Sequence, residues 1–264
     1  MYLPRSSALA RVALLDETPS TNDALLALAE SSPEYTVVAT ANQTAGRGRL
    51  GREWIAPPGQ TLAASVLLRP RLPAGQALEL SHWGWIPLIA GLALTRAIAA
   101  LLPSDGTTLK WPNDVLVNGR KVSGILAELL PRGDGLVLGA GINLAIPANG
   151  LPTPTSTSLG LEGATLSGDE LADAVLSGWL AEFRPLYGEF LHLGGDADGS
   201  GIREQVSAAC SSLGQRVRVH LPGGDDLSGA AIDIDRSGRL CVKRETDGRV
   251  QAVAAGDVTH LRYE

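Results

Sequence analysis

Three strand-like runs between residues 109 and 144 constrain the fold of this chain more than any other feature. The runs cover residues 109–117, 121–130 and 136–144. Asn118-Gly119 separates the first two runs, and both residues tolerate a positive φ, which makes the pair a strong signal for a tight hairpin. Residues 131–135 form a second reversal rich in turn residues. Because connections this short join only antiparallel strands, we expect an antiparallel meander here.

The rest of the first 213 residues alternates between strand-like and helix-like patterns. Ser20-Thr21-Asn22 precedes an apolar periodic stretch in the manner of a helix N-cap. We expect strands at 12–15, 36–41 and 62–68, and helices from residue 20, at 78–102 with a kink at Pro87, at 167–193 and at 202–210. These elements predict an α+β fold, a mixed and largely antiparallel sheet flanked by helices.

The pattern changes from Gly214 onward. Short alternating runs follow one another at 217–221, 232–234, 240–242, 250–253 and 258–261, separated by turns. Five short strands with tight turns predict a small β-barrel. We therefore expect two domains, at 1–213 and 214–264.

Composition excludes several classes of protein. The net charge of −6 over 264 residues argues against a general nucleic-acid binder, which needs a basic face. The longest uncharged apolar run, 83–94, is too short to span a bilayer, and the first residues lack a secretory signal. Cys210 and Cys241 are far apart, which suits reduced thiols. These features predict a cytoplasmic protein without a membrane segment.

Residues 46–51 match the G-x-G-x-x-G pattern of dinucleotide-binding folds and follow a predicted strand. That fingerprint should open a helix and be followed by an acidic residue about 20 positions later. Here Pro57-Pro58-Gly59 ends the segment, and Arg69 to Arg71 occupies the later region. We reject a dinucleotide site.

The same loop places three arginines, Arg47, Arg49 and Arg52, among glycines and directly before Trp54. Guanidinium groups match the oxygens of phosphates and carboxylates, and an indole can stack on a purine. A solvated charged loop is the usual fate of a basic cluster. In an acidic protein, the interleaving with glycine favours an anion-binding loop.

A second group of polar residues belongs to the predicted meander. Lys110 and Lys121 could point to one face of a twisted hairpin and add positive charge beside an anionic substrate, although a hairpin with exposed lysines fits the spacing equally well. Gly124 weakens its strand unless a ligand or backbone approaches closely. Asn143 is a lone polar residue in an apolar strand, which a hydrogen bond to the backbone would also explain. The four histidines show no ligand spacing.

The same segments, in the same order, resemble the biotin–protein ligase family. The matching motifs are PSTN at 19–22, QTAGRGRLGREW at 43–54, KWPNDV at 110–115, KVSGILAE at 121–128, GAGINL at 139–144 and AGDVTHLR at 255–262. The resemblance implies a catalytic domain like that of class II synthetases, followed by an SH3-like barrel. Ser123 stands where the family often has alanine. The first motif lies so early that a helix-turn-helix domain, and with it a repressor role, is not expected.

The resemblance also implies roles for individual residues. Ser20, Thr21 and Gln43 would bind the ureido head of biotin, with Gly46, Arg47, Gly124 and Leu126 lining its pocket. Arg49, Arg52 and Lys121 would hold the biotin carboxylate and the α-phosphate of ATP, with Arg47 also screening charge and Lys121 also counted among the biotin-binding residues. Trp54 and Asn143 would face the adenine. Asp114 would either orient the ligand or help to hold Mg²⁺.

The implied reaction joins biotin to a lysine of a biotin carboxyl carrier domain, of the acetyl-CoA carboxylase type, through biotinyl-5′-AMP. ATP and Mg²⁺ are the implied co-reactants, and the enzyme would be a monomer or a weak homodimer. A lipoate–protein ligase shares this chemistry, but its glycine-rich motif, which resembles RRxSGGG, does not occur here. A non-catalytic binding module is the other alternative, and the presence of all the charged site positions argues against it.

Overall fold

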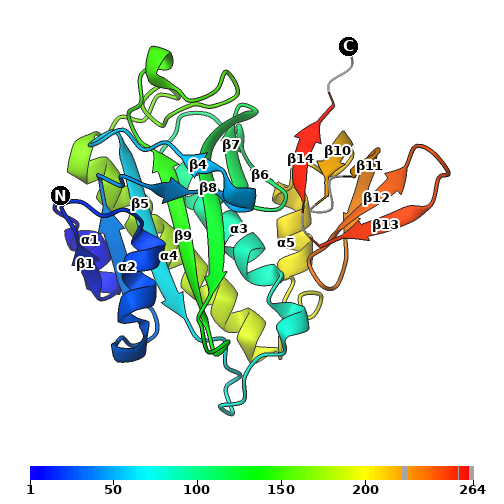
Figure 1. Ribbon diagram of the computed structural model, residues 1–264, viewed down its shortest axis with the longest axis horizontal. Helices are drawn as coiled ribbons and strands as arrows, with labels where there is room; N and C mark the ends of the chain where they lie inside the picture. Colours follow the sequence, from blue (N-terminus) through cyan, green and yellow to red (C-terminus); the bar gives the residue numbers. More distant parts are fainter. Residues whose placement is uncertain (222–224, 255, 262–264) are drawn as a thin grey trace.

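The computed structural model describes residues 1–221, 225–254 and 256–261. A seven-stranded sheet with helices on both faces forms the larger part, and a five-stranded antiparallel sheet follows it (Figure 1). The predicted α+β class is confirmed. In the described part of the chain, no helix combines the length and the apolar character that crossing a membrane would require.

The larger sheet has the strand order β1-β2-β5-β9-β8-β7-β6. Only β1 and β2 pair in parallel, and the other neighbours are antiparallel. The meander is therefore confirmed, with Asn118 and Gly119 both at positive φ in its first turn. The strands are β1 (Val12–Leu14), β2 (Val37–Thr40), β5 (Thr61–Leu68), β6 (Thr107–Lys110), β7 (Asp114–Val117), β8 (Arg120–Leu129) and β9 (Leu136–Asn143).

The single run expected at 109–117 was wrong, because it forms two strands. β6 ends at Lys110 and β7 begins at Asp114, with a turn between them in which the N–H of Asn113 donates to the carbonyl of Lys110. Pro112 has no N–H for a strand ladder, which favours a turn at this point. The turn carries the middle of the KWPND motif to the end of the sheet.

The helices are α1 (Pro4–Leu9), α2 (Thr21–Leu28), α3 (Trp85–Ala99), α4 (Gly168–His192) and α5 (Ile202–Ala209). The expected start of the second long helix at residue 78 was wrong, because α3 begins at Trp85. Pro87 is thus the third residue of α3 rather than a kink inside it. In the first turn of a helix the missing N–H of proline breaks no intrahelical bond.

The two faces of the larger sheet differ in what they bury. Val37, Val66 and Leu138 point to the face covered by α3 and α4, where the main core lies. On the opposite face, Leu25 of α2 packs with Val38, Leu67 and Val137 in a smaller cluster. Side chains alternate between faces along a strand. The next positions on the α2 face, Ala63 and Ser65 of β5 and Gly139 and Gly141 of β9, are all small, so this face is hollowed beyond α2.

The smaller sheet has the order β13-β12-β11-β10-β14, all antiparallel, which confirms five strands after residue 214, although the second begins at Asp226 rather than at the expected residue 232. Among the described residues no ladder joins β13 to β14. Ala255 and Arg262, which begin and end the AGDVTHLR motif, lie outside the described residues. The strands are β10 (Arg216–His220), β11 (Asp226–Ile234), β12 (Leu240–Arg244), β13 (Val250–Val253) and β14 (Asp257–His260).

Two indoles of the larger part hold one turn of the smaller sheet. Trp85, the first residue of α3, donates its Nε1–H to the carbonyl of Arg236 at 2.8 Å. Trp111, in the turn between β6 and β7, donates to the carbonyl of Gly238 at 3.0 Å. Both indoles are buried. The turn between β11 and β12 is thereby tied to the segment that carries the KWPND motif.

Candidate active site

A cavity of about 130 Å³ lies on the α2 face of the larger sheet. Its lining comes from the first turn of α2, the loop that follows β2, and strands β5 and β7–β9. Most of the residues named from the sequence are in this lining: Ser20, Thr21, Gln43, Arg47, Arg49, Arg52, Trp54, Asp114, Lys121, Gly124 and Leu126. Segments far apart in the sequence thus converge on one hollow.

Three glycines on the floor let other side chains lie directly against the sheet. A Cβ at Gly139 would stand 2.2 Å from Asn22 Oδ1, and one at Gly141 would stand 2.4 Å from Trp54 Cε2. At Gly124 it would meet Lys121 Nζ at 3.1 Å. Any larger residue would displace these side chains. The close approach expected at Gly124 is therefore present, and it is made by a lysine and an indole.

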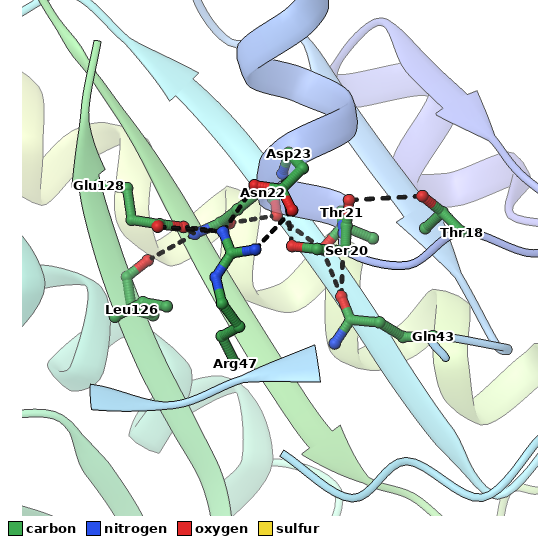
Figure 2. Close-up of polar contacts among 10 residues, drawn as sticks. Thr18, Ser20, Thr21, Asn22, Asp23, Gln43, Arg47, Leu126 and Glu128 are labelled. Carbon is green, nitrogen blue, oxygen red and sulfur yellow. Dashed lines mark hydrogen bonds and ion pairs between the residues drawn. The ribbon is translucent and has the colours of Figure 1, made fainter. Parts of the chain in front are cut away.

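Hydroxyl and amide groups line one end of the cavity, beside the ion pairs of Arg47 with Asp23 and Glu128 (Figure 2). Ser20 is the N-cap of α2, its Oγ accepting from Asp23 N at 3.4 Å. The Oε1 of Gln43 accepts from the backbone N of Thr21 at 2.9 Å and from its Oγ1 at 3.2 Å. Ser65 Oγ lies 2.8 Å from Thr21 Oγ1. Hydroxyl and amide groups held in this way can recognise a small, uncharged polar ring.

The other end is rimmed by cations and an aromatic ring. Lys121 Nζ lies 2.6 Å from Asp114 Oδ1 and 5.6 Å from the centroid of the Trp54 ring. Arg49 Nη1 donates to Asn113 Oδ1 at 3.2 Å. The Nε1 of Trp54 is buried and has no hydrogen-bond partner among the described residues. Fixed positive charge beside an aromatic face suits a nucleotide and its phosphates.

Two carboxylates hold the guanidinium of Arg47. Asp23 of α2 and Glu128 of β8 both accept from it. The hydrogen bond from Arg47 lowers the pKa of Asp23, and the bond to Asp23 raises the pKa of Arg47. The charge of Arg47 is thus compensated within the protein.

Three of the residues named from the sequence do not contribute to the lining of the cavity. Gly46 lies next to it, packed so closely that a Cβ would meet Gln43 Nε2 at 2.5 Å. Asn143 is buried, and its Nδ2 donates to the carbonyl of Thr157 at 2.9 Å. Lys110 is likewise absent from the lining, so Lys110 and Lys121 do not share the site.

Sequence reasoning missed several residues of the site. Asn22 and Asn113 lie in the motifs PSTN and KWPND, where no signal separated them from their neighbours. Asp23 directly follows the PSTN motif and Glu128 ends the KVSGILAE motif, but neither was given a role from the sequence. Gly256, which directly precedes β14, also contributes to the lining. Among the described residues, no group of three or more His, Cys, Asp or Glu side chains has the arrangement of a metal site.

Comparison with known proteins finds two family models. A model of the biotin/lipoate A/B protein ligase family matches residues 14–143, and one of the biotin protein ligase C-terminal domain matches residues 212–261. A biotin–(acetyl-CoA-carboxylase) ligase of Mycobacterium tuberculosis is 38% identical, with 93% of this chain and 87% of the relative covered. One of Paracoccus denitrificans is 34% identical, with 93% and 98% covered.

Solved structures give the same result. A biotin protein ligase from Aquifex aeolicus, in complex with biotin and ATP, has a TM-score of 0.72 and 27% identity, with 96% of this chain and 99% of that chain covered. A biotin protein ligase from Leishmania major, in complex with biotinyl-5-AMP, has a TM-score of 0.56 and 26% identity, with 93% and 99% covered.

Proposed function

The chain belongs to the biotin protein ligase family, and from this premise we propose how its own residues activate biotin with ATP and transfer it to a carrier lysine. The enzyme is a ligase whose substrates are biotin and ATP and whose intermediate is biotinyl-5′-AMP. One observation carries the proposal for this chain. A single cavity joins a neutral polar end, at Thr21 and Gln43, to a cationic end, at Arg49 and Lys121.

The neutral end suits the ureido ring of biotin, which is polar and uncharged. Ser20, Thr21 and Gln43 offer a hydroxyl, a second hydroxyl and an amide toward the hollow. Gly124 and Leu126 would leave room for the bicyclic body of biotin, and Arg47 would close the pocket from the loop, with Gly46 packed against Gln43 beside it. The valeryl chain of biotin would then run past the side chains that cover the three glycines, toward the cations.

The cationic end suits the reacting groups. A carboxylate and a triphosphate repel each other, so their approach needs fixed positive charge. We assign Arg49, Arg52 and Lys121 to the biotin carboxylate and the α-phosphate, and Trp54 to the adenine. The amide of Asn143 is occupied by Thr157. We therefore assign Asn143 to holding the loop at residue 157 beside the nucleotide, rather than to the adenine itself.

The reaction then follows from positioning and charge. A carboxylate oxygen of biotin attacks the α-phosphorus, the new O–P bond forms, and the bond to the β-phosphate breaks with release of pyrophosphate. The neutral amine of the carrier lysine next attacks the acyl carbon, a C–N bond forms, and AMP leaves as the amine loses its proton to water. Neither step needs a nucleophilic side chain of the enzyme.

Magnesium is part of the proposal as the ion that accompanies ATP. Asp114, the residue named for a metal from the sequence, has its Oδ1 at 2.6 Å from Lys121 Nζ. A carboxylate engaged in this way does not fit a resident metal site. We assign Asp114 to orienting Lys121 instead.

The partner belongs to the proposal as well. Relatives named as ligases of acetyl-CoA carboxylase imply a biotin carboxyl carrier domain as the protein substrate. We propose that the protein substrate is the carrier domain of an acetyl-CoA carboxylase. We also propose that the enzyme is a monomer or a weak homodimer, with a boundary between its two domains at residue 213. It would act in the cytoplasm, where ATP is available, and would not bind nucleic acid.

Exchange of labelled pyrophosphate into ATP tests this function. The exchange should depend on biotin and should be absent when lipoate or octanoate replaces it. Exchange that depends on lipoate would instead identify the protein as a lipoate–protein ligase. No exchange with any of these acids would contradict the ligase assignment.

A further inference from the structure

The guanidinium of Arg47 donates hydrogen bonds to two carboxylates, one from a helix and one from a strand (Figure 2). Its two Nη atoms form a fork on Asp23, with distances of 2.5 and 2.6 Å. Its Nη2 also donates to the two carboxylate oxygens of Glu128, at 3.1 and 3.2 Å. Asp23 belongs to the first turn of α2 and Glu128 to β8. One guanidinium therefore links a helix, a strand and the loop of residues 46–52.

Glu128 is itself held by a buried residue. Asn22 is 4% exposed, and its Nδ2 donates to Glu128 Oε2 at 2.6 Å. The Oδ1 of Asn22 accepts from Ser65 Oγ at 2.6 Å. Most ion pairs at a protein surface contribute little because both side chains remain mobile. Here the forked geometry and the anchored acceptor limit that mobility.

Arg47 lies at the base of the loop. Gly46–Arg47 (β3) pairs with Glu53–Trp54 (β4) in a short antiparallel hairpin. The tip of this hairpin contains Leu50, which is 55% exposed and has a positive φ. The hydrogen bonds of Arg47 therefore fix the base of the hairpin and leave residues 48–52 as the part that can move.

The base also borders the neutral end of the cavity. Gly46 packs against Gln43, whose Oε1 accepts from Thr21. Thr21, Asn22 and Asp23 are consecutive residues of α2. Thr21 forms a hydrogen bond with Gln43, Asn22 with Glu128 and Asp23 with Arg47. One helical turn thus sets both the polar pocket and the position of the loop beside it.

We propose that Asp23 and Glu128 are positioning residues for biotin, which fix Arg47 so that the loop closes over the head of biotin from a fixed base. The proposal rests on the proposed function for its substrate. It gives Arg47 the task of fixing the base of the loop, because two carboxylates hold its guanidinium. Asp23 and Glu128 themselves touch neither biotin nor ATP.

Asp23→Asn and Glu128→Gln test the proposal through the split between KM and kcat in pyrophosphate exchange. Each variant should raise the KM for biotin about five- to tenfold and leave kcat within about twofold of wild type, because a binding contact made before the reaction is weakened. The double variant should raise KM by less than the product of the single effects, since both carboxylates act through Arg47. Asp23→Glu, which keeps the charge, should stay closer to wild type than Asp23→Asn.

Trypsin cleavage gives a second measurement that does not depend on activity. Cleavage after Arg49 and Arg52, without ligand, should be several times faster in both variants. Glu245→Gln is the matched control, because it removes an exposed pair with Arg216, 2.7 Å long, in the smaller sheet. It should change neither the cleavage nor the KM.

Unchanged KM and unchanged cleavage in the two variants would overturn the proposal, as would a fall in kcat with KM constant. If the wild type shows no exchange with biotin, the proposed function fails, and the trypsin rates alone then decide whether the two carboxylates fix the loop.

Discussion

Lys121 Nζ lies 2.6 Å from Asp114 Oδ1, across the hairpin formed by β7 and β8. The backbone N–H of Lys121 donates to the carbonyl of Thr155, and its carbonyl accepts from the N–H of Thr157. The ammonium group is therefore directed into the cavity by its own hairpin and by a neighbouring loop. This geometry explains why a residue on a short hairpin can serve as a fixed positive charge.

Lys121→Ala should lower the rate of biotinyl-5′-AMP formation by about 100-fold or more, because a preorganised cation at the reacting phosphate is lost. The fold should persist, since the side chain is part of the cavity wall rather than of the core. Exchange kinetics and a thermal melt check the two statements. Lys243→Ala, in β12, is the control. A rate within tenfold of wild type would remove Lys121 from the reaction.

Gly141→Ala should weaken ATP binding, because the new methyl group would stand 2.4 Å from the indole of Trp54 and force it to move. We expect a higher KM for ATP and a loss of about 1–3 kcal/mol of stability. Gly188→Ala on α4 is a suitable control, since nothing lies within 4 Å of the added atom. A variant with normal ATP binding would show that the indole does not need its place on the glycine floor.

Trp111→Phe should weaken the contact between the smaller sheet and the larger part of the protein. The carbonyl of Gly238 would lose its donor, at a cost of about 1–3 kcal/mol for a buried group left unpaired. Urea unfolding and proteolysis near residue 213 measure the effect. Trp83→Phe removes an indole bond to Leu78, inside the larger part, and should leave the segment near 213 protected. Equal proteolysis in both variants would contradict this role of Trp111.

The pairing of Asp23 with Arg47 should depend on pH in a defined direction. The hydrogen bond from Arg47 lowers the pKa of Asp23, so the carboxylate stabilises the fold above its ordinary pKa and this contribution is lost as the pH falls through the lowered value. The stability difference between wild type and Asp23→Asn should stay constant from about pH 7 to 5 and shrink below about pH 4. Thermal melts at each pH measure it. A difference that grows in acid would contradict the assignment.

Local signals in the sequence predicted most of the fold. Ser20 caps α2 as expected, and Asn118-Gly119 forms the tight turn of the meander. The division of residues 109–117 into two strands was not predicted, because an apolar run conceals a turn. The hairpin of β3 and β4 was missed for another reason. Strands of two residues depend on their surroundings rather than on their own pattern.

The site was predictable where a motif carried it, and less so where contacts join distant segments. Arg49, Lys121 and Gly124 follow from motifs, and they line one cavity. Glu128 ends the KVSGILAE motif, but it lies 81 residues from Arg47, and the motif does not indicate that the two side chains pair. Only the order of the sheet brings it beside α2. The arginines of the loop looked equivalent in the sequence, whereas in the structure carboxylates engage Arg47 and an asparagine engages Arg49.

The most direct test of the central claim, that this cavity joins biotin to ATP and then to a carrier, is the mass of an apo biotin carboxyl carrier domain incubated with the protein, biotin, ATP and magnesium. We predict the addition of one biotinyl group to a single lysine, dependent on ATP and lost with Lys121→Ala. A carrier whose mass does not change, or one that gains biotin equally well without ATP, would contradict the account.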